Sequence, residues 1–190
     1  MSGQKPVKPS ADSLAAAVRT VKPRGLPPVH LWNPPLTGEM DMRIARDGTW
    51  YHEGTPINRP NMVRLFSSIL KLEDGQFFLV TPVEKVVITV DDAPFVAVDC
   101  DVTGDGRDQV LTFTTNVGDT TIAGPENRIR LERDPETSEP SPYVHVRAGL
   151  EALIDRKTFY RLVDQGTEHQ GWFGVWSSGQ FFPLAPADQL

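Results

Sequence analysis

The sequence predicts an α+β protein built from two structurally similar domains, each a mainly antiparallel sheet with one helix, related by an internal duplication. The segment INRPNMVRLF at residues 57–66 returns as IDRKTFYRLV at residues 154–163. The tetrapeptide GQFF at residues 75–78 returns at residues 179–182, again after the longer match. Two matches in one order, with similar spacing, indicate that a structural unit occurs twice.

The first 23 residues are predicted to be a polar tail that leads into a short helix over residues 13–21. Five prolines follow within residues 23–35. They exclude a central strand, because proline lacks the N–H donor of the ladder. We expect an extended arm that Leu31 and Trp32 anchor on the core.

The N-terminal repeat domain is predicted over residues 24–82. Asp47-Gly48 favours a tight hairpin between two strands of alternating polarity. Asn58 fits the N-cap of the helix that follows, and Pro60 is tolerated in its first turn. The strand QFFLV completes the domain. The apolar face of the helix is predicted at Met62, Leu65, Phe66, Ile69 and Leu70.

The C-terminal domain is predicted over residues 83–190 and is rich in strand segments. KVVITV, FVAVDCDV, QVLTFTT and RIRLE carry the β-branched and aromatic residues that strands favour. A turn at residues 104–108 and an acidic, proline-rich loop at residues 133–142 connect them. The second repeat covers about residues 143–185, with a hairpin, a helix capped by Asp155 and a second hairpin.

Composition excludes several classes of function. The net charge of −6 argues against sequence-independent nucleic-acid binding, which needs a large basic surface. No apolar run reaches the roughly 18–20 residues of a membrane span, so we expect no membrane association. The single cysteine, Cys100, excludes an intramolecular disulfide framework and favours a reducing compartment. We therefore expect a soluble cytoplasmic protein.

Patterns of catalytic and metal-binding residues are scarce. Cys100 lies between Asp99 and Asp101, whose charges disfavour a thiolate. The four histidines fall in no metal-ligand spacing. The segment from Asp101 resembles a calcium loop but has Thr112 where a bidentate carboxylate is needed, so it is predicted to be a hairpin turn. We expect no catalytic residue, no metal and no cofactor.

Several longer segments carry a family resemblance. They are WNP (32–34), PINRPNMVRLF (56–66), TPVEK (81–85), TNVGD (115–119), GLEALIDRKTFYRLV (149–163) and GVWSSGQFF (174–182). From about Leu31 to the end, the chain resembles the uncharacterised bacterial family domain of unknown function 1285. The resemblance implies a duplicated two-domain α+β fold whose C-terminal half is superficially similar to a pleckstrin-homology domain. It also implies a suspected site for a nucleotide-like ligand at the domain interface, and a signalling role.

Arg59 and Arg156 recur at equivalent places, in the first turn of each predicted helix. A cation there opposes the helix dipole, whereas an anion is favoured by the free N–H groups. Two interpretations are open: the arginines bind an anion in a cleft between the halves, or they are structural, each pairing with an acid such as Glu53 or Glu151 or bracing the preceding hairpin. The candidate ligand-binding residues are Trp32, Arg59, Glu84, Lys85, Asn116, Arg147 and Arg156.

The leading hypothesis is a non-enzymatic binding module for a small anionic, nucleotide-like ligand at the domain interface, with Trp32 as a stacking partner. One alternative is an enzyme, such as a hydrolase, with a composite site at that interface. The other is an adaptor that binds a protein partner through exposed sheet edges.

Overall fold

The computed structural model describes residues 9–20 and 25–190 of the chain. Residues 1–8 and 21–24 lie outside the described residues. Most of the predicted tail and the end of the predicted first helix fall in these two segments.

Two compact units divide the chain. Unit 1 comprises the described residues up to Ala45 together with Thr49–Asp91, and unit 2 comprises Arg46–Gly48 and Asp92–Leu190. Each unit contains a six-stranded, mainly antiparallel sheet and one of the two repeated helices. The predicted α+β class with two domains is therefore confirmed.

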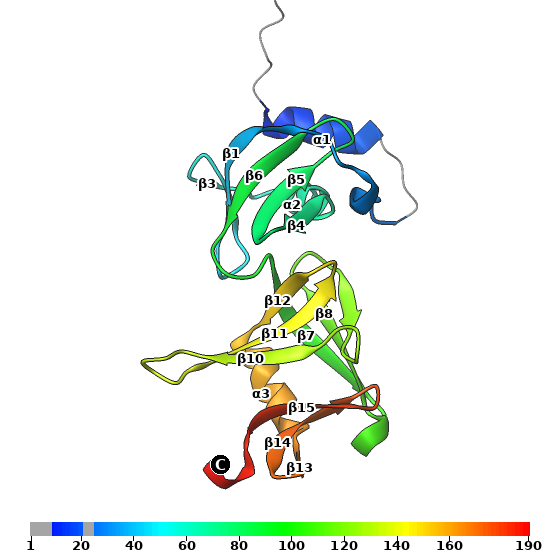
Figure 1. Ribbon diagram of the computed structural model, residues 1–190, viewed down its shortest axis with the longest axis vertical. Helices are drawn as coiled ribbons and strands as arrows, with labels where there is room; N and C mark the ends of the chain where they lie inside the picture. Colours follow the sequence, from blue (N-terminus) through cyan, green and yellow to red (C-terminus); the bar gives the residue numbers. More distant parts are fainter. Residues whose placement is uncertain (1–8, 21–24) are drawn as a thin grey trace, which may run out of the picture. The chain divides into compact units, whose positions relative to one another are not determined.

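Six strands form the sheet of unit 1. They are β1 (Leu36–Ile44), β2 (Trp50–His52), β3 (Thr55–Pro56), β4 (Leu70–Glu73), β5 (Gln76–Val80) and β6 (Lys85–Val90). Their order in the sheet is β3-β2-β1-β6-β5-β4 (Figure 1). All pairs are antiparallel except the central pair β1–β6, which is parallel. Because β6 belongs to this sheet, the boundary predicted at residues 82–83 is too early, and the units divide after Asp91.

Helix α1 (Ala11–Thr20) bears out the predicted first helix in its described part. Leu14 and Val18 are one turn apart, so they lie on the same face, and both are buried. Asp12 in its first turn and Arg19 in its last turn each complement the helix dipole.

The proline-rich arm follows in the described residues from Gly25 onwards. It contains the 3-10 turn η1 (Val29–Leu31), which contacts β4. Leu31 is 72% exposed, so its predicted role as an anchor is wrong. Trp32 is half-buried, and its carbonyl accepts a hydrogen bond from Lys71 Nζ on β4 at 3.1 Å.

Helix α2 (Pro60–Ser67) packs its apolar face into the core of unit 1. Phe66 stacks on the fully buried Trp50 of β2, with 6.3 Å between the ring centroids. The helix is shorter than predicted, because Leu70 pairs with Leu79 and opens β4. The apolar residues at its end are buried all the same, but Leu70 is buried as part of a strand.

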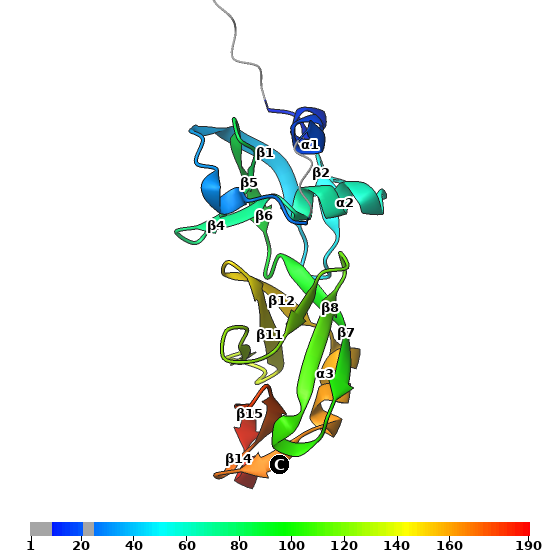
Figure 2. The same cartoon turned by 90° about the vertical axis from the view of Figure 1, so that its right-hand side faces the viewer.

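Unit 2 has two sheets and the helix α3 (Arg156–Asp164). Its strands are β7 (Phe95–Thr103), β8 (Val110–Thr115), β9 (Thr120–Ile122), β10 (Ile129–Arg133), β11 (Pro140–Arg147), β12 (Leu150–Ile154), β13 (Thr167–His169), β14 (Trp172–Ser177) and β15 (Gln180–Pro186). The orders are β10-β11-β12-β7-β8-β9 and β13-β14-β15. Figure 2 labels β11, β12, β7 and β8 of the first sheet and β14 and β15 of the second. The pair β12–β7 is parallel and all others are antiparallel. Helix α3 contacts both sheets, through β7 and β14.

The predicted connections of unit 2 are present. The 3-10 turn η2 (Gly106–Asp108) joins β7 to β8, as predicted for the calcium-like segment. The acidic loop between β10 and β11 is closed by Asp134, whose side chain accepts the N–H groups of Glu136 and Thr137 at 2.8 Å. These backbone donors lower the pKa of the Asp134 carboxyl. The short strands β9 and β13 were not predicted.

The two repeated segments share their order of elements. The hairpin β1–β2 precedes α2 and the hairpin β4–β5, and the hairpin β11–β12 precedes α3 and the hairpin β14–β15. Both GQFF segments begin in two-residue turns, Asp74-Gly75 with φ of 48° and 78°, and Ser178-Gly179 with φ of 51° and 75°. Positive φ at both positions is typical of type I′ hairpins and favours glycine. The sheets differ, since β4–β5 joins the main sheet of unit 1 whereas β14–β15 forms a separate sheet with β13.

The two repeated helices begin differently. Helix α3 has the predicted cap: the Asp155 side chain accepts the Thr158 N–H at 2.8 Å. The N-cap of α2 is Arg59, which makes no side-chain cap hydrogen bond, so the predicted Asn58 cap is wrong. Pro60 at the first helical position has no N–H, which leaves one donor fewer for a cap to satisfy.

Asp155→Ala is expected to lower the free energy of unfolding by about 1 kcal/mol, because it removes the cap of α3. Asn58→Ala is the matched control and is expected to change it by less than about 0.5 kcal/mol. Urea denaturation followed by circular dichroism measures both. Equal losses in the two variants would contradict this difference between the helices.

Candidate functional site

A groove in unit 2 combines apolar walls with charged rims. Its volume is about 650 Å³. Residues of β7, β12 and the first half of α3 form it together with the start of β11 and with Arg46 and Asp47. This volume lies within the range of small-molecule sites in proteins.

The walls of the groove follow from the strand periodicity. Val96 and Val98 are two residues apart on β7 and therefore share one face. Leu153 of β12 is the parallel register partner of Val96 and extends the same surface. Phe159 of α3 closes the apolar part, and Tyr160 beside it is 61% exposed at the mouth. These apolar side chains form a floor against which the apolar part of a ligand can be buried.

Arg156 is the first residue of α3 and lies on the rim of the groove. Its Nη2 is 2.7 Å from Glu139 Oε1, and the two side chains are 73% and 62% exposed. Exposed ion pairs of this kind contribute only about 0–1 kcal/mol. Glu139 is therefore a weak partner that a ligand anion can displace at little cost.

Arg46 supplies the second guanidinium of the rim. It donates to Asp92 Oδ2 at 2.7 Å and to Ser141 Oγ at 2.9 Å. Asp92 also accepts the Tyr143 hydroxyl at 2.7 Å, so this carboxylate keeps a donor if Arg46 moves. Burial and the Asp92 hydrogen bond raise the pKa of Tyr143 to about 12, which keeps its hydroxyl protonated at neutral pH.

Of the predicted site residues in unit 2, only Arg156 lines the groove. Asn116 does not line it, and its Oδ1 accepts the Val96 N–H at 3.0 Å, which fixes the start of β7. Arg147 is bound to Asp119 at 2.6 Å, with its guanidinium 5.0 Å from the Phe95 ring centroid. The contacts of Asn116 and Arg147 are therefore structural.

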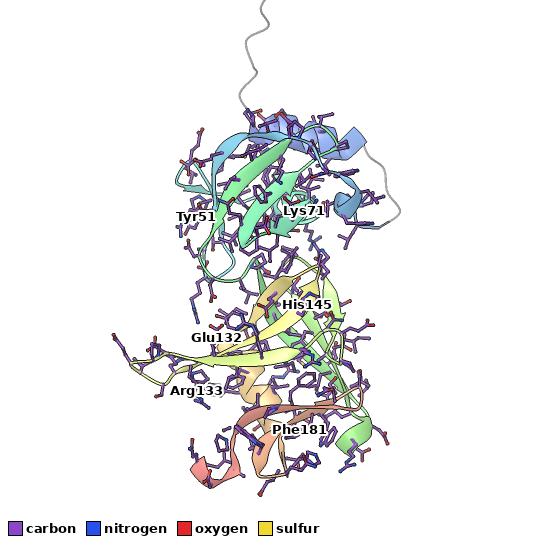
Figure 3. The ribbon with its side chains drawn as sticks, viewed as in Figure 1. Tyr51, Lys71, Glu132, Arg133, His145 and Phe181 are labelled. Atoms are coloured by element: carbon purple, nitrogen blue, oxygen red, sulfur yellow. The ribbon has the colours of Figure 1, made fainter. Side chains whose placement is uncertain are left out.

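Two of the predicted residues in unit 1 share a network of contacts. Lys85 pairs with Glu73, which also binds Lys71 at 2.9 Å, and Lys71 in turn donates to the Trp32 carbonyl. Figure 3 labels Lys71 in unit 1. The hydrogen bond from Lys85, and after it the one from Lys71, lowers the pKa of the Glu73 carboxyl. The Lys85 ammonium lies 4.3 Å from the Phe78 ring centroid. This network braces β4, β5 and β6 against the arm.

The other two predicted residues of unit 1 have separate surroundings. Glu84 closes the turn before β6, where its N–H donates to Thr81 Oγ1 at 3.0 Å. Arg59 is exposed, and no ion pair among residues 9–20 and 25–190 includes it. The two repeated arginines therefore differ, and the acid that pairs with Arg156 is Glu139 rather than Glu151. That the ligand lies at the junction of the domains stays a prediction.

Models of two family domains match consecutive stretches of the chain. The "domain of unknown function (DUF1285), N-terminal domain" matches residues 27–93, and the "protein of unknown function (DUF1285), C-terminal domain" matches residues 94–184. This chain belongs to the DUF1285 family. The junction of the two matches agrees with the end of unit 1 after Asp91.

Two solved structures of DUF1285 family proteins resemble the chain. The protein from Silicibacter pomeroyi DSS-3 is 68% identical, with a TM-score of 0.87, and the match covers 93% of this chain and 96% of that one. The protein from Shewanella baltica OS155 is 28% identical, with a TM-score of 0.52, and the match covers 66% of this chain and 92% of that one. A search of curated proteins finds no match.

The thiol of this DUF1285 protein is held protonated. Burial, above all, raises the pKa of Cys100 to about 12. Asp99 and Asp101 add to this shift, as predicted, but they contribute less than burial does, and Arg161 opposes it. Within the described part of the chain, no group of three or more histidine, cysteine, aspartate and glutamate side chains is placed to hold a metal ion.

The helices of the described residues are too short or too polar to cross a membrane.

Proposed function

We propose that this DUF1285 protein is a non-enzymatic binding module whose unit 2 groove holds a small amphipathic anion, nucleotide-like in combining a planar apolar body with a phosphate or carboxylate. The observation that carries the proposal is the apolar floor of a groove that two arginines, Arg46 and Arg156, also line. The proposed setting is cytoplasmic signalling, in which ligand occupancy is the signal.

The charges of the rim favour one anionic group rather than several. Each arginine is already neutralised, Arg156 by Glu139 and Arg46 by Asp92. A single phosphate or carboxylate that replaces Glu139 gains a charge-assisted contact beside an apolar surface. A polyphosphate would meet the remaining acids, Asp47 among them.

The raised pKa values of Cys100 and Tyr143 support a binding role over an enzyme that uses a cysteine thiol or a tyrosine hydroxyl as its nucleophile. A nucleophile needs a lowered pKa or an adjacent base. Cys100 and Tyr143 are both shifted to about 12, away from reactivity at neutral pH.

The sheet edges support a binding groove over an edge-strand adaptor. Lys71 ties the edge strand β4 to the arm through the Trp32 carbonyl. The edge strand β10 carries Arg130 and Glu132, which pair with each other, and charges on an edge disfavour addition of a strand.

Arg156→Ala is expected to weaken the binding of a mononucleotide or an aryl phosphate about 10- to 100-fold, because a hydrogen bond to a charged group contributes roughly 1.5–3 kcal/mol. Thermal unfolding against a panel of nucleotides and aryl phosphates first selects the probe, since saturation at 100 times Kd adds about 2.7 kcal/mol. Calorimetry then compares the variants.

Arg59→Ala is the matched control, since Arg59 is the N-cap of the equivalent helix but lies in unit 1. Its affinity is expected to match that of the wild type, whereas Arg46→Ala is expected to weaken binding as Arg156→Ala does. Unchanged affinity in Arg156→Ala, or a loss confined to Arg59→Ala, would refute the groove as the site.

A further inference from the structure

A second pocket in unit 2 lies at the opposite end of α3 from the groove. The groove includes residues of the first half of this helix, whereas the pocket includes Gln165, its C-cap. Its volume is about 360 Å³, and η2, β13 and β14 supply its other walls. Nothing in the proposed function uses it.

The aromatic rings of Trp176 and His169 line this pocket, and the Phe181 ring contacts both of them. Trp176 and Phe181 are cross-strand partners on β14 and β15, with ring centroids 5.3 Å apart. His169 of β13 lies 4.9 Å from Trp176 and 5.0 Å from Phe181 (Figure 3 labels Phe181 on β15). The guanidinium of Arg107 in η2 is 5.0 Å from the Trp176 ring centroid. The planar guanidinium of Arg107, which belongs to the exposed turn η2, therefore already lies over the Trp176 indole.

Gln109 supplies a buried polar group to the same pocket. Its side chain lines the pocket, and the residue is only 6% exposed. Its Nε2 donates to the Trp176 carbonyl at 3.1 Å, so the amide is oriented with Oε1 away from that carbonyl. Among the described residues, no hydrogen-bond donor reaches Oε1. Oε1 is not among the buried polar atoms that lack a partner, which in the described residues are Trp50 Nε1 and Thr158 Oγ1, so it is an acceptor that solvent reaches and that a ligand N–H can use in place of water.

We propose that this pocket binds a planar nitrogen heterocycle of the nucleobase class. The ring stacks on Trp176 in the place of the Arg107 guanidinium, and a ring or exocyclic N–H donates to Gln109 Oε1. Glu168 and Arg107 give the rim one charge of each sign, which suits a neutral ring rather than an ion. The site is independent of the groove, because the two share no lining residue.

The test uses the full chain and two probes, adenine, which carries N–H donors, and caffeine, a stacking purine without one. The indole N–H signal of Trp176 in nitrogen-proton NMR spectra, assigned by its loss in Trp176→Phe, reports binding. We expect adenine to shift this signal in a saturable way and caffeine to bind at least tenfold more weakly. Trp176→Leu is expected to weaken adenine binding, measured by calorimetry, about 5- to 100-fold, the range for loss of one base stack.

Gln109→Met removes the acceptor at nearly constant size and is expected to abolish the preference for adenine over caffeine. If Gln109→Met does not fold, His169→Ala replaces it and is expected to weaken both probes equally. Arg156→Ala, in the groove, is expected to leave adenine binding unchanged, which separates this site from the proposed function. Equal affinities of the two probes for the wild type, or no shift of the Trp176 signal at saturating adenine, would overturn the proposal.

Discussion

Trp50→Ala is expected to lower the free energy of unfolding by about 3–5 kcal/mol, the largest loss among the substitutions considered. Trp50 is 1% exposed and stacks on Phe66 at the centre of unit 1, so alanine leaves a cavity that the surrounding strands fill only in part. Urea denaturation followed by circular dichroism measures the loss.

Two controls separate packing from other effects of losing a tryptophan. Trp172→Ala removes a ring that is 45% exposed and is expected to lose less than half as much. Trp50→Phe keeps much of the packing and removes an indole N–H that has no hydrogen-bond partner in the described residues, so most of the stability should be retained. A loss below about 1 kcal/mol in Trp50→Ala would show that this stack does not hold unit 1 together.

Ser177→Ala is expected to lower the free energy of unfolding by about 1–3 kcal/mol. The fully buried Ser177 hydroxyl accepts the Leu111 N–H at 2.9 Å and donates to the Ala123 carbonyl at 2.7 Å. It therefore ties the small sheet of unit 2 to β8 and to the segment after β9. Alanine leaves the Leu111 N–H without this acceptor where water does not reach.

Ser178→Ala is the matched control for this substitution. Ser178 is the next residue, is exposed, and also donates to the Ala123 carbonyl, at 2.9 Å. Because Ser177 continues to serve that carbonyl, the loss is expected to stay below about 0.5 kcal/mol. Equal losses in the two variants would mean that the buried hydroxyl contributes no more than the exposed one.

Elements with a local signal were predictable from the sequence. Asp155 marks the start of α3, and glycine in the second turn position marks hairpins such as Ser178-Gly179. The place of β6 was not predictable, because its parallel partner β1 is distant in the chain and no turn signal links them. The end of α2 was missed since Leu70 fits an apolar helix face as well as a buried strand.

Only the residue of the candidate site that belongs to a repeated segment could be predicted from the sequence. Arg156 was predicted because it occupies the same position in the second repeated segment as Arg59 does in the first. In the structure, however, the two arginines have different surroundings. Glu139, Ser141 and Arg46 carry no local signal, since only the sheet register and the hairpin turn bring them near Arg156. Periodicity specifies which face a side chain takes, but not which distant segment it meets.

The parallel central strand pairs determine the order in which parts of the sheets can form while the chain is being synthesised. Hairpins closed by two-residue turns form in about 1–10 μs once both strands exist. The pair β1–β6 must wait until residues 85–90 have been made, a delay on the order of a few seconds at about 5–20 residues per second. Throughout this delay Met42 and Ile44 of β1, fully buried in the finished unit, lack their central neighbour. We expect the nascent chain to be most prone to aggregation then, and ribosome-bound chains that end just before β6 to engage chaperones most strongly.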